Sequence, residues 1–156
     1  IRLYGIDAPE KKQKCKKTYL TISFMSFTKD YMCGEVSTQK LIKKINKQKL
    51  NCNILDVDRY KRLIGECFKR NINLNSWMVS NGYAVAYRKY SKKYVSDEIN
   101  AKNNKLGIWQ GKFEMPWDLG EKINLYSLKE LSSIHSQRCL ANDLLTNKLT
   151  NSLSLL

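Results

Sequence analysis

The alternation of apolar and polar positions predicts short strands. Four stretches fit this period: residues 1–6, 50–55, 63–68 and 84–88. In the first stretch, alternation places Arg2, Tyr4 and Ile6 on one face of the strand. The second and third stretches flank a polar segment at 58–62, so together they predict a hairpin over 50–68.

Helical spacing of apolar residues predicts three helices, at about 36–47, 75–81 and 93–106. Four side chains of the first helix are expected to point inward: Val36, Leu41, Ile42 and Ile45. Asn75 is placed to cap the second helix, Gly82 to end it, and Gly107 to end the third. Residues 11–17 read as a basic loop that leads into an irregular stretch ending at Cys33 and Gly34.

A turn that carries two carboxylates follows the first strand. Asp7 and Glu10 bracket Ala8-Pro9, where proline stops a strand and turns the chain, and Arg2 lies close by in the sequence. Hard divalent cations bind oxygen ligands, and phosphodiester hydrolysis needs a carboxylate that orients water beside a guanidinium group. The alternative interpretation is a solvated strand end with a surface ion pair.

Further motifs follow this turn in a fixed order. Asp58-Arg59-Tyr60-Lys61-Arg62 places a second arginine where the next strand begins. The later motifs are Asn73-Leu74-Asn75, Met78–Ala84, Tyr87–Tyr90, Gly107-Ile108-Trp109 and Pro116-Trp117. Together with the opening R-x-x-G-I-D-A-P-E pattern, this ordered set resembles the staphylococcal nuclease family over roughly residues 1–118.

This resemblance implies an α+β, mainly β fold: a five-stranded OB-type barrel with about three helices. It also implies a calcium-dependent endonuclease that hydrolyses phosphodiester bonds in DNA or RNA with little sequence preference. The family's two phosphate-binding arginines fall on Arg2 and Arg62, and its general base or water-positioning glutamate falls on Glu10. The metal ligands that it implies are the Asp7 side chain and the Ala8 backbone carbonyl.

The chain also departs from the family pattern. The family's other metal-binding aspartate lies on a strand before the arginine strand, so we expect an N-terminally truncated family member with an incomplete barrel and an open strand edge. Lys61 stands where the family usually has glycine, which costs energy if that position has positive φ. The alternative function is a catalytically impaired nucleic-acid-binding or protein-interaction module on the same barrel.

The charge of the chain favours a polyanionic partner. Its formal net charge is +14, and residues 123–156 contain only three basic and two acidic residues, so the excess lies in the first 122 residues. Three tyrosines are the expected nucleic-acid contacts: Tyr60, Tyr87 and Tyr90. For Tyr87 and Tyr90 the alternative is packing against the barrel. The alternative explanation of the charge is that the lysines only keep the protein soluble. Trp109 and Trp117 are expected to pack within the protein and not to stack on bases.

Four of the five cysteines form two candidate pairs. Cys52 and Cys67 lie symmetrically about the 58–62 turn, and could face each other as a disulfide or as two reduced core cysteines. Cys15 and Cys33 bracket the stretch before the first helix. The positions resemble those of an exported bacterial branch of the family, which implies a disulfide in each pair and a secreted or periplasmic location.

The sequence divides into a nuclease-like domain at 1–121 and a tail at 122–156 that is expected to be weakly structured. The tail is rich in Leu, Ser, Asn and Thr, and its single histidine, His135, is expected to be an uninvolved surface residue. No run approaches the ~20 apolar residues that a membrane-spanning helix needs. We expect a monomer that binds DNA or RNA.

Overall fold

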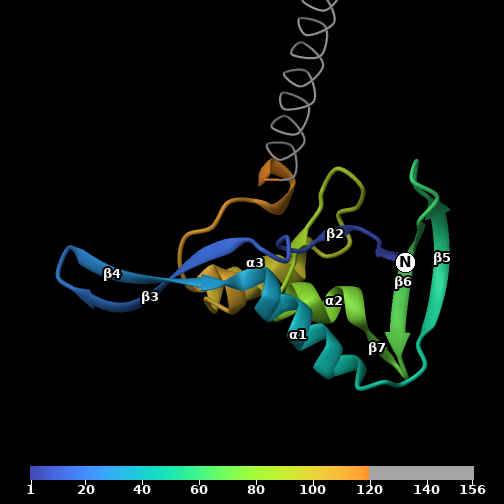
Figure 1. Cartoon of the computed structure of the whole chain (residues 1–156), viewed down its shortest axis with the longest axis horizontal. Helices are drawn as coiled ribbons and strands as arrows, with labels where there is room; N and C mark the ends of the chain where they lie inside the picture. The colour runs from blue at the N-terminus through green and yellow to red at the C-terminus, as the bar shows by residue number, and fades with distance from the viewer. Residues whose placement is uncertain (120–156) are drawn as a thin grey trace, which may run out of the picture. The chain divides into compact units, whose positions relative to one another are not determined.

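An antiparallel hairpin is the centre of a four-stranded sheet within residues 1–119. The computed structural model describes residues 1–119, and in it β5 (Asn51–Val57) pairs with β6 (Leu63–Lys69), as the sequence predicts for residues 50–68. Two short strands extend this sheet: β1 (Arg2–Leu3) runs parallel to β6, and β7 (Ile72–Asn73) runs antiparallel to it. Figure 1 shows β5 and β6 side by side at one end of the described unit, which spans Ile1–Trp117.

The predicted single strand over residues 1–6 is wrong. The chain forms β1, turns at Gly5, and then forms β2 (Ile6–Asp7), which pairs antiparallel with β8 (Val85–Ala86). Gly5 has φ +69°, and a Cβ atom there would lie 2.9 Å from the Cβ of Ser91. This turn lets the chain leave β6 and pair with β8. The strand predicted at 84–88 is confirmed as β8, in a shorter form.

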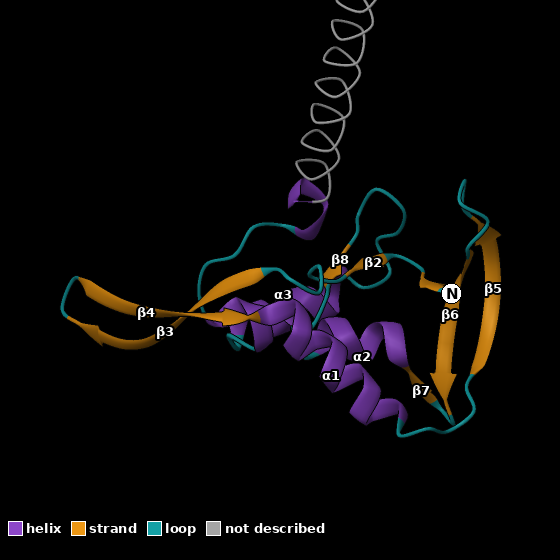
Figure 2. Cartoon of the chain, in the orientation of Figure 1, coloured by secondary structure: helices purple, strands orange, loops and turns teal. Residues whose placement is uncertain are grey.

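The predicted irregular stretch before the first helix is also wrong. It forms a long hairpin of β3 (Lys14–Ile22) and β4 (Met25–Met32), which extends away from the helices in Figures 1 and 2. Cys15 is its single fully buried residue. Both faces of most of the hairpin meet solvent, so its sequence lacks the inward-facing apolar pattern on which strand prediction depends.

The first helix, α1 (Cys33–Ile45), begins three residues before the predicted start. Leu41 packs against the core, as expected. The inward placement of Val36 and Ile42 is wrong, because their exposed fractions are 38% and 55%. The residues that α1 buries instead are Cys33, Gly34 and Ser37, near the start of the helix. The helix therefore packs through its N-terminal turn, and not along a continuous apolar face.

The other helices follow in the predicted order: α2 (Leu74–Ser80), α3 (Val95–Asn103) and the short 3-10 helix η1 (Gly107–Gln110). Gly82, with φ +69°, follows α2 and ends it as predicted. The predicted cap at Asn75 is wrong, because the Asn73 side chain accepts hydrogen bonds from the N–H groups of Asn75 and Ser76. This releases the Asn75 side chain for a buried role described below.

Two apolar clusters form the core. The first contains Ile6, Met78, Val79, Ala84, Ala86 and Tyr94, and the second contains Cys15, Cys33, Val85 and Ile108. Trp109 and Trp117 pack against the second cluster, which confirms their expected packing role. The α+β, mainly β class is confirmed; the sheets of residues 1–119 are open and are consistent with an OB-type fold. The expectations for the 122–156 tail and His135 lie outside the described residues.

Two disulfides link segments of this unit. One joins Cys52 to Cys67, which are direct partners in the β5–β6 register, and the other joins Cys15 at the base of the β3–β4 hairpin to Cys33 at the start of α1. Within residues 1–119, no helix has both the length and the apolar composition that crossing a bilayer requires.

Candidate functional site

An open cavity of about 320 Å³ brings together residues that are far apart in the sequence. All five residues predicted for phosphate binding, catalysis and metal binding line it: Arg2, Asp7, Ala8, Glu10 and Arg62. Apolar side chains, including Ile6, Leu41 and Met78, form other parts of the wall. The turn at Gly5 thus does not separate Arg2 from Asp7, because the chain bends back toward the same cavity.

Asp7 and Arg2 form a loose ion pair within this cavity. Arg2 Nη2 lies 3.7 Å from Asp7 Oδ1, and both side chains remain partly exposed. Burial raises the pKa of Asp7, and the nearby Glu10 raises it further, whereas the Arg2 guanidinium and the Ala8 N–H lower it. The net direction is upward. Its environment therefore disfavours the charged form of Asp7, and a bound cation would favour that form.

The turn that presents Glu10 is held by Gln13, a residue that sequence reasoning missed. The Glu10 N–H donates to Gln13 Oε1 at 3.2 Å, and the Glu10 carbonyl accepts from the Gln13 N–H at 2.7 Å. The Gln13 side chain is buried and donates to the carbonyl of Glu114 at 2.7 Å. Gly34 permits this close packing, since a Cβ atom there would lie 1.7 Å from the Glu10 carbonyl oxygen. The exposed Glu10 carboxylate thus stands on a fixed turn.

Arg62 reaches the cavity from the β5–β6 turn. Asp58 organises this turn, because one oxygen of its carboxylate accepts from the N–H groups of Tyr60 and Arg62, and the other accepts from Arg62 Nε at 2.6 Å. Desolvation acts to raise the pKa of Asp58, but the hydrogen bonds from Arg62 and Tyr60 outweigh it and hold that pKa below its usual value. Asp58 thus engages Nε of Arg62, and Arg62 is also one of the residues that line the cavity.

The same turn contains Lys61 in the left-handed region, with φ +60°. Its N–H donates to the Asp58 carbonyl at 2.9 Å, and the Asp58 N–H donates to the Arg62 carbonyl at 3.0 Å. The position therefore needs a positive φ, which glycine adopts without cost. Lysine is held there by the hydrogen bonds around it.

The three predicted nucleic-acid-binding tyrosines lie in different settings. Tyr87 and Tyr90 line a second, smaller cavity of about 80 Å³, which shares Arg2 with the first. Tyr87 stacks on Trp117, with ring centroids 5.2 Å apart and planes at 7°, so one of its faces is covered. Tyr90 is 56% exposed, and its carbonyl accepts from the Tyr4 hydroxyl. Tyr60 is 63% exposed and lies beside Arg62, outside both cavities.

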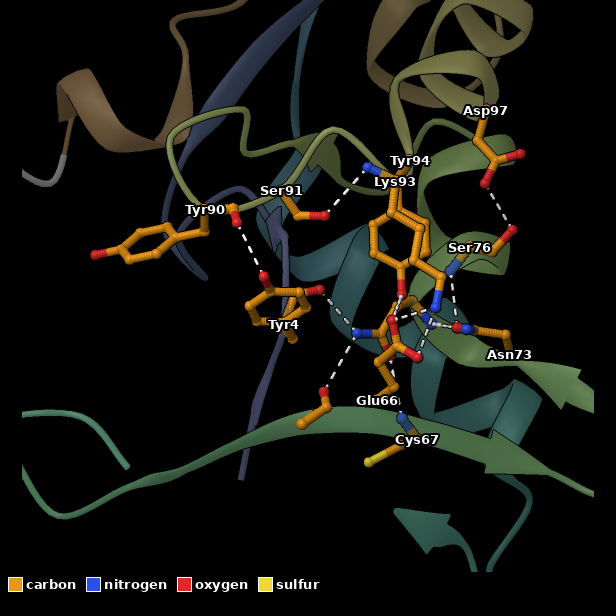
Figure 3. A network of polar contacts seen from close by, with 12 residues as sticks. Tyr4, Glu66, Cys67, Asn73, Ser76, Tyr90, Ser91, Lys93, Tyr94 and Asp97 are labelled. Atoms are coloured by element: carbon orange, nitrogen blue, oxygen red, sulfur yellow. Dashed lines mark hydrogen bonds and ion pairs between the residues drawn. The ribbon is translucent and has the colours of Figure 1, made fainter. Parts of the chain in front are cut away.

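A buried amide holds the segment that follows β1 against β6. Asn75 is fully buried, and its Nδ2 donates to the carbonyls of Tyr4 at 2.9 Å and Gly65 at 3.3 Å. Its Oδ1 accepts from the Cys67 N–H at 3.2 Å. Figure 3 shows this network between the segment that contains Tyr4 and strand β6. The pair of asparagines at 73 and 75 was the available sequence signal, since one caps α2 and the other is free to point inward.

A second buried group supports the same region. Glu66 on β6 accepts from Lys93 Nζ at 2.6 Å and from the Tyr94 hydroxyl at 2.7 Å (Figure 3). Desolvation acts to raise the pKa of Glu66, but these two hydrogen bonds and the Lys93 charge lower it overall. Burial and the hydrogen bond to Glu66 raise the pKa of Tyr94 above its usual value. These contacts join the residues directly before α3 to β6.

The donor atoms of the first cavity suit a hard cation. Asp7 and Glu10 offer carboxylate oxygens, and Ala8 offers a backbone carbonyl, which are the ligand types that calcium and magnesium prefer. Among residues 1–119, no group of three or more His, Cys, Asp or Glu side chains could hold a metal ion. A calcium or magnesium ion bound by Asp7 and Ala8 would therefore complete its six or more oxygen ligands with water and substrate oxygens.

Comparisons with known proteins place the chain in a family. Residues 1–111 match the family model described as staphylococcal nuclease homologue. The chain is 29% identical over 121 residues to the probable staphylococcal-like nuclease CAN3 of Oryza sativa subsp. japonica, covering 76% of this chain and 27% of that protein. It is 31% identical over 134 residues to a Haemophilus influenzae protein named as an uncharacterized endonuclease, covering 80% and 63%.

A third relative has a different kind of name. The succinoglycan biosynthesis protein ExoI of Rhizobium meliloti is 31% identical over 117 residues, covering 73% of this chain and 57% of that protein. The chain thus spans between about a quarter and just under two thirds of these relatives. Because the family model covers most of the sequence and the site residues gather in one cavity, the chain belongs to the staphylococcal nuclease homologue family.

Proposed function

We propose that this chain forms the catalytic core of a metal-dependent endonuclease that hydrolyses phosphodiester bonds in DNA or RNA with low sequence specificity. The observation that carries the proposal is that two arginines, two carboxylate residues and Ala8 line one open cavity. Two relatives named as nucleases or endonucleases support it. The cavity is open to solvent, as a site for a polymeric substrate must be.

In this proposal, Arg2 and Arg62 bind the scissile phosphate from two sides of the cavity. Guanidinium groups form paired hydrogen bonds with phosphate oxygens and stabilise negative charge that develops on them. Glu10 orients the attacking water and accepts its proton. Glu10 is suited to this role because its turn is fixed by Gln13 while its carboxylate stays exposed.

Asp7 and the Ala8 carbonyl would hold the metal ion, and we propose calcium. When bound, the cation would supply Lewis-acid stabilisation to a phosphate oxygen. The upward shift of the Asp7 pKa supports this assignment, because burial and Glu10 leave the carboxylate in need of positive charge. Calcium tolerates irregular oxygen ligand sets, which suits one carboxylate and one backbone carbonyl completed by water and substrate oxygens.

The exposed tyrosines are proposed to contact bases next to the phosphate site. Tyr90 and Tyr60 have free ring area, and a stacked base contributes roughly 1–3 kcal/mol to binding. Tyr87 lines the small cavity, but Trp117 covers one face of its ring, so we assign it to the cavity wall with an edge or a single face toward substrate.

We also propose that the protein works in an oxidising compartment, as a monomer. Two disulfides within residues 1–119 support an exported location, because such bonds persist outside the reducing cytosol.

The function is tested by incubating the full chain with labelled single-stranded DNA and RNA, with calcium, with magnesium, or with a chelator. We expect cleavage with calcium and none with chelator. Glu10→Gln should lower kcat by roughly 10²–10⁴, and Arg2→Ala or Arg62→Ala by roughly 10²–10³.

Matched controls are available for each substitution. Arg59→Ala removes an arginine from the same turn as Arg62, but Arg59 lies outside the cavity, and Glu35→Gln changes an exposed glutamate on α1. Both controls should retain near-complete activity. Full activity in Glu10→Gln, or activity unaffected by chelator, would contradict the mechanism. Oligonucleotide binding without any cleavage would instead favour the binding-module interpretation.

A further inference from the structure

The β3–β4 hairpin presents an apolar end that neither core cluster uses. Six large apolar residues in its outer half are exposed, with fractions from 37% for Phe27 to 92% for Phe24; the others are Tyr19, Leu20, Ile22 and Met25. Figure 1 shows the hairpin extending away from the rest of the described unit. A contiguous patch of exposed apolar side chains commonly marks a binding surface.

Charge is distributed along the hairpin in two sharply separated halves. No residue from Thr18 to Thr28 is charged. Directly behind this end, Lys17 and Lys29 are exposed partners in the strand register, and Lys14 and Lys16 follow toward the base, where Asp30 is the register partner of Lys16. Two like charges facing each other across a strand pair destabilise the hairpin unless an anion neutralises them. The hairpin therefore has an uncharged apolar end with a collar of lysines behind it.

We propose that this hairpin binds an anionic lipid bilayer, with its end in the interface and its lysine collar on the headgroup phosphates. Apolar residues ahead of cationic residues are the arrangement by which peripheral segments bind such surfaces. The five residues from Thr18 to Ile22 span roughly 15 Å of strand, which suffices to place the turn beneath the headgroups while the lysines stay at their level.

The composition of the end favours shallow insertion. Hydroxyl side chains are interspersed among the apolar ones: Thr18, Thr21, Ser23, Ser26 and Thr28. Unpaired strand edges are not tolerated in the hydrocarbon core, but the hydrated interface satisfies both hydroxyls and free backbone groups. A nucleic acid is a poorer fit, because its backbone attracts cations along the whole contact and the outer half of the hairpin has none.

The test is sedimentation of the full chain with vesicles of phosphatidylcholine alone or mixed with phosphatidylglycerol. We expect binding to the anionic vesicles and much less to the neutral ones. The double variant Ile22→Asp/Phe24→Asp should weaken binding by roughly tenfold or more, because the apolar contact is lost. Lys17→Glu/Lys29→Glu should weaken it by at least roughly fivefold for each lysine.

Ile99→Asp is the matched control, since Ile99 is 51% exposed on α3 and should not affect vesicle binding. A gentler variant, Phe24→Trp, adds a direct readout: its added fluorescence should shift to the blue with anionic vesicles. The variants of the apolar end, Ile22→Asp/Phe24→Asp and Phe24→Trp, should retain oligonucleotide binding and monomeric mass.

Four results would each overturn the proposal. The first is no binding of the wild-type chain to anionic vesicles. The second is unchanged binding by Ile22→Asp/Phe24→Asp, which would assign the affinity to the general positive charge of the protein. The third is loss of oligonucleotide binding in that variant, which would make the hairpin a nucleic-acid contact. The fourth is a wild-type oligomer that the variant converts to monomer, which would make the apolar end a contact between copies of the chain.

Discussion

The segment from Arg2 to Glu10 and the β3–β4 hairpin are neighbours in the sequence, but they are supported in opposite ways. Behind the first lie buried polar side chains: Asn75 holds the Tyr4 carbonyl, and Gln13 holds both backbone groups of Glu10. The hairpin has one fully buried residue, Cys15, at its base. The first segment is thus held in place by buried hydrogen bonds, whereas the side chains of the outer hairpin are exposed to solvent without such support.

This contrast separates two kinds of functional surface. Catalysis depends on groups held within a fraction of an ångström, which requires a supporting layer of packed and hydrogen-bonded residues. Insertion into a fluid interface makes no such demand, and only apolar area and charge decide its strength. We therefore expect substitutions behind the cavity to change stability strongly, and substitutions on the outer hairpin to leave it nearly unchanged.

The largest expected effect comes from the two disulfides. Their cysteines are 15 and 18 residues apart, and closing loops of this size contributes about 3 kcal/mol in the chain-entropy description. Cys52→Ala/Cys67→Ala and Cys15→Ala/Cys33→Ala should each lower the free energy of unfolding by about that amount. Urea unfolding monitored by tryptophan fluorescence measures the loss.

The two double variants should differ in local stability. Loss of the Cys15–Cys33 bond frees the base of the hairpin, so trypsin should cleave faster at its exposed lysines, whereas loss of the Cys52–Cys67 bond should leave this cleavage rate unchanged relative to global unfolding. Peptide mapping of the wild-type chain from an oxidising compartment is the necessary control. Free thiols at all four positions would contradict the prediction.

The next effect concerns Asn75. Asn75→Ala leaves the Tyr4 carbonyl and the Cys67 N–H without their buried partner, which should lower the free energy of unfolding by about 2 kcal/mol. Asn75→Asp still accepts from Cys67 but cannot donate to Tyr4, so it tests the link to the Arg2 strand. Thr21→Ala, on the exposed hairpin, is the control and should change stability by less than about 0.5 kcal/mol.

Kinetics distinguish positioning from simple stabilisation. If Asn75 holds the Arg2 strand in place, Asn75→Asp should lower kcat at temperatures where the variant is fully folded, and Thr21→Ala should not. An Asn75→Asp variant with lower stability but wild-type kcat would show that Asn75 supports the fold without positioning the site.

A smaller effect is expected at two turns with positive φ. Lys61, next to Arg62, has φ +60°, and Ser23, at the hairpin turn, has φ +52°. Glycine relieves the strain at either position, offset by greater entropy in the unfolded chain, so Lys61→Gly should raise the free energy of unfolding by about 0.5–1 kcal/mol. Ser23→Gly should change it less, because the outer hairpin opens without unfolding the core. Equal gains in thermal denaturation would show that hairpin and core unfold together.

The same contrast explains how far sequence reasoning reached. Residues that meet in the cavity could be found because their chemical types stand in a recognisable order, from Arg2 through Asp7 and Glu10 to Arg62. The β5–β6 hairpin could be found because a polar turn separates two apolar stretches. The hairpin and the turn from Asp7 to Glu10 are local patterns, whereas Arg62 was assigned to the site through the order of motifs that resembles the family.

Features that depend on distant partners could not be found in this way. Gly5 breaks the first strand because β8, about eighty residues later, offers a second partner. Asn75 looks like a helix cap until β6 and Tyr4 supply hydrogen bonds to its side chain. The β3–β4 hairpin was missed for the opposite reason: no core faces it, so its pattern carries no inward direction.

The smallest expected effect concerns the Asp7 carboxylate, and it depends on pH. Burial and Glu10 raise the folded-state pKa of Asp7 above its ordinary value of 3.8, so its charged form costs stability in the folded protein. This cost is absent below the ordinary pKa and is complete once the pH exceeds the raised one. Without metal, Asp7→Asn should therefore be more stable than the wild-type chain at pH 7, and the difference should shrink as the pH falls toward 3.8.

Thermal melts of Asp7→Asn and the wild-type chain across this pH range, in chelator, measure the difference. Asp30→Asn, on the exposed hairpin, is the control and should change stability by less than about 0.5 kcal/mol at pH 7. Added calcium should stabilise the wild-type chain through binding to the folded state and should stabilise Asp7→Asn less. A less stable Asp7→Asn at pH 7 without metal would contradict this prediction. It would mean that the ion pair with Arg2 outweighs the cost of burial, so that the Asp7 carboxylate stabilises the folded protein even without a metal ion.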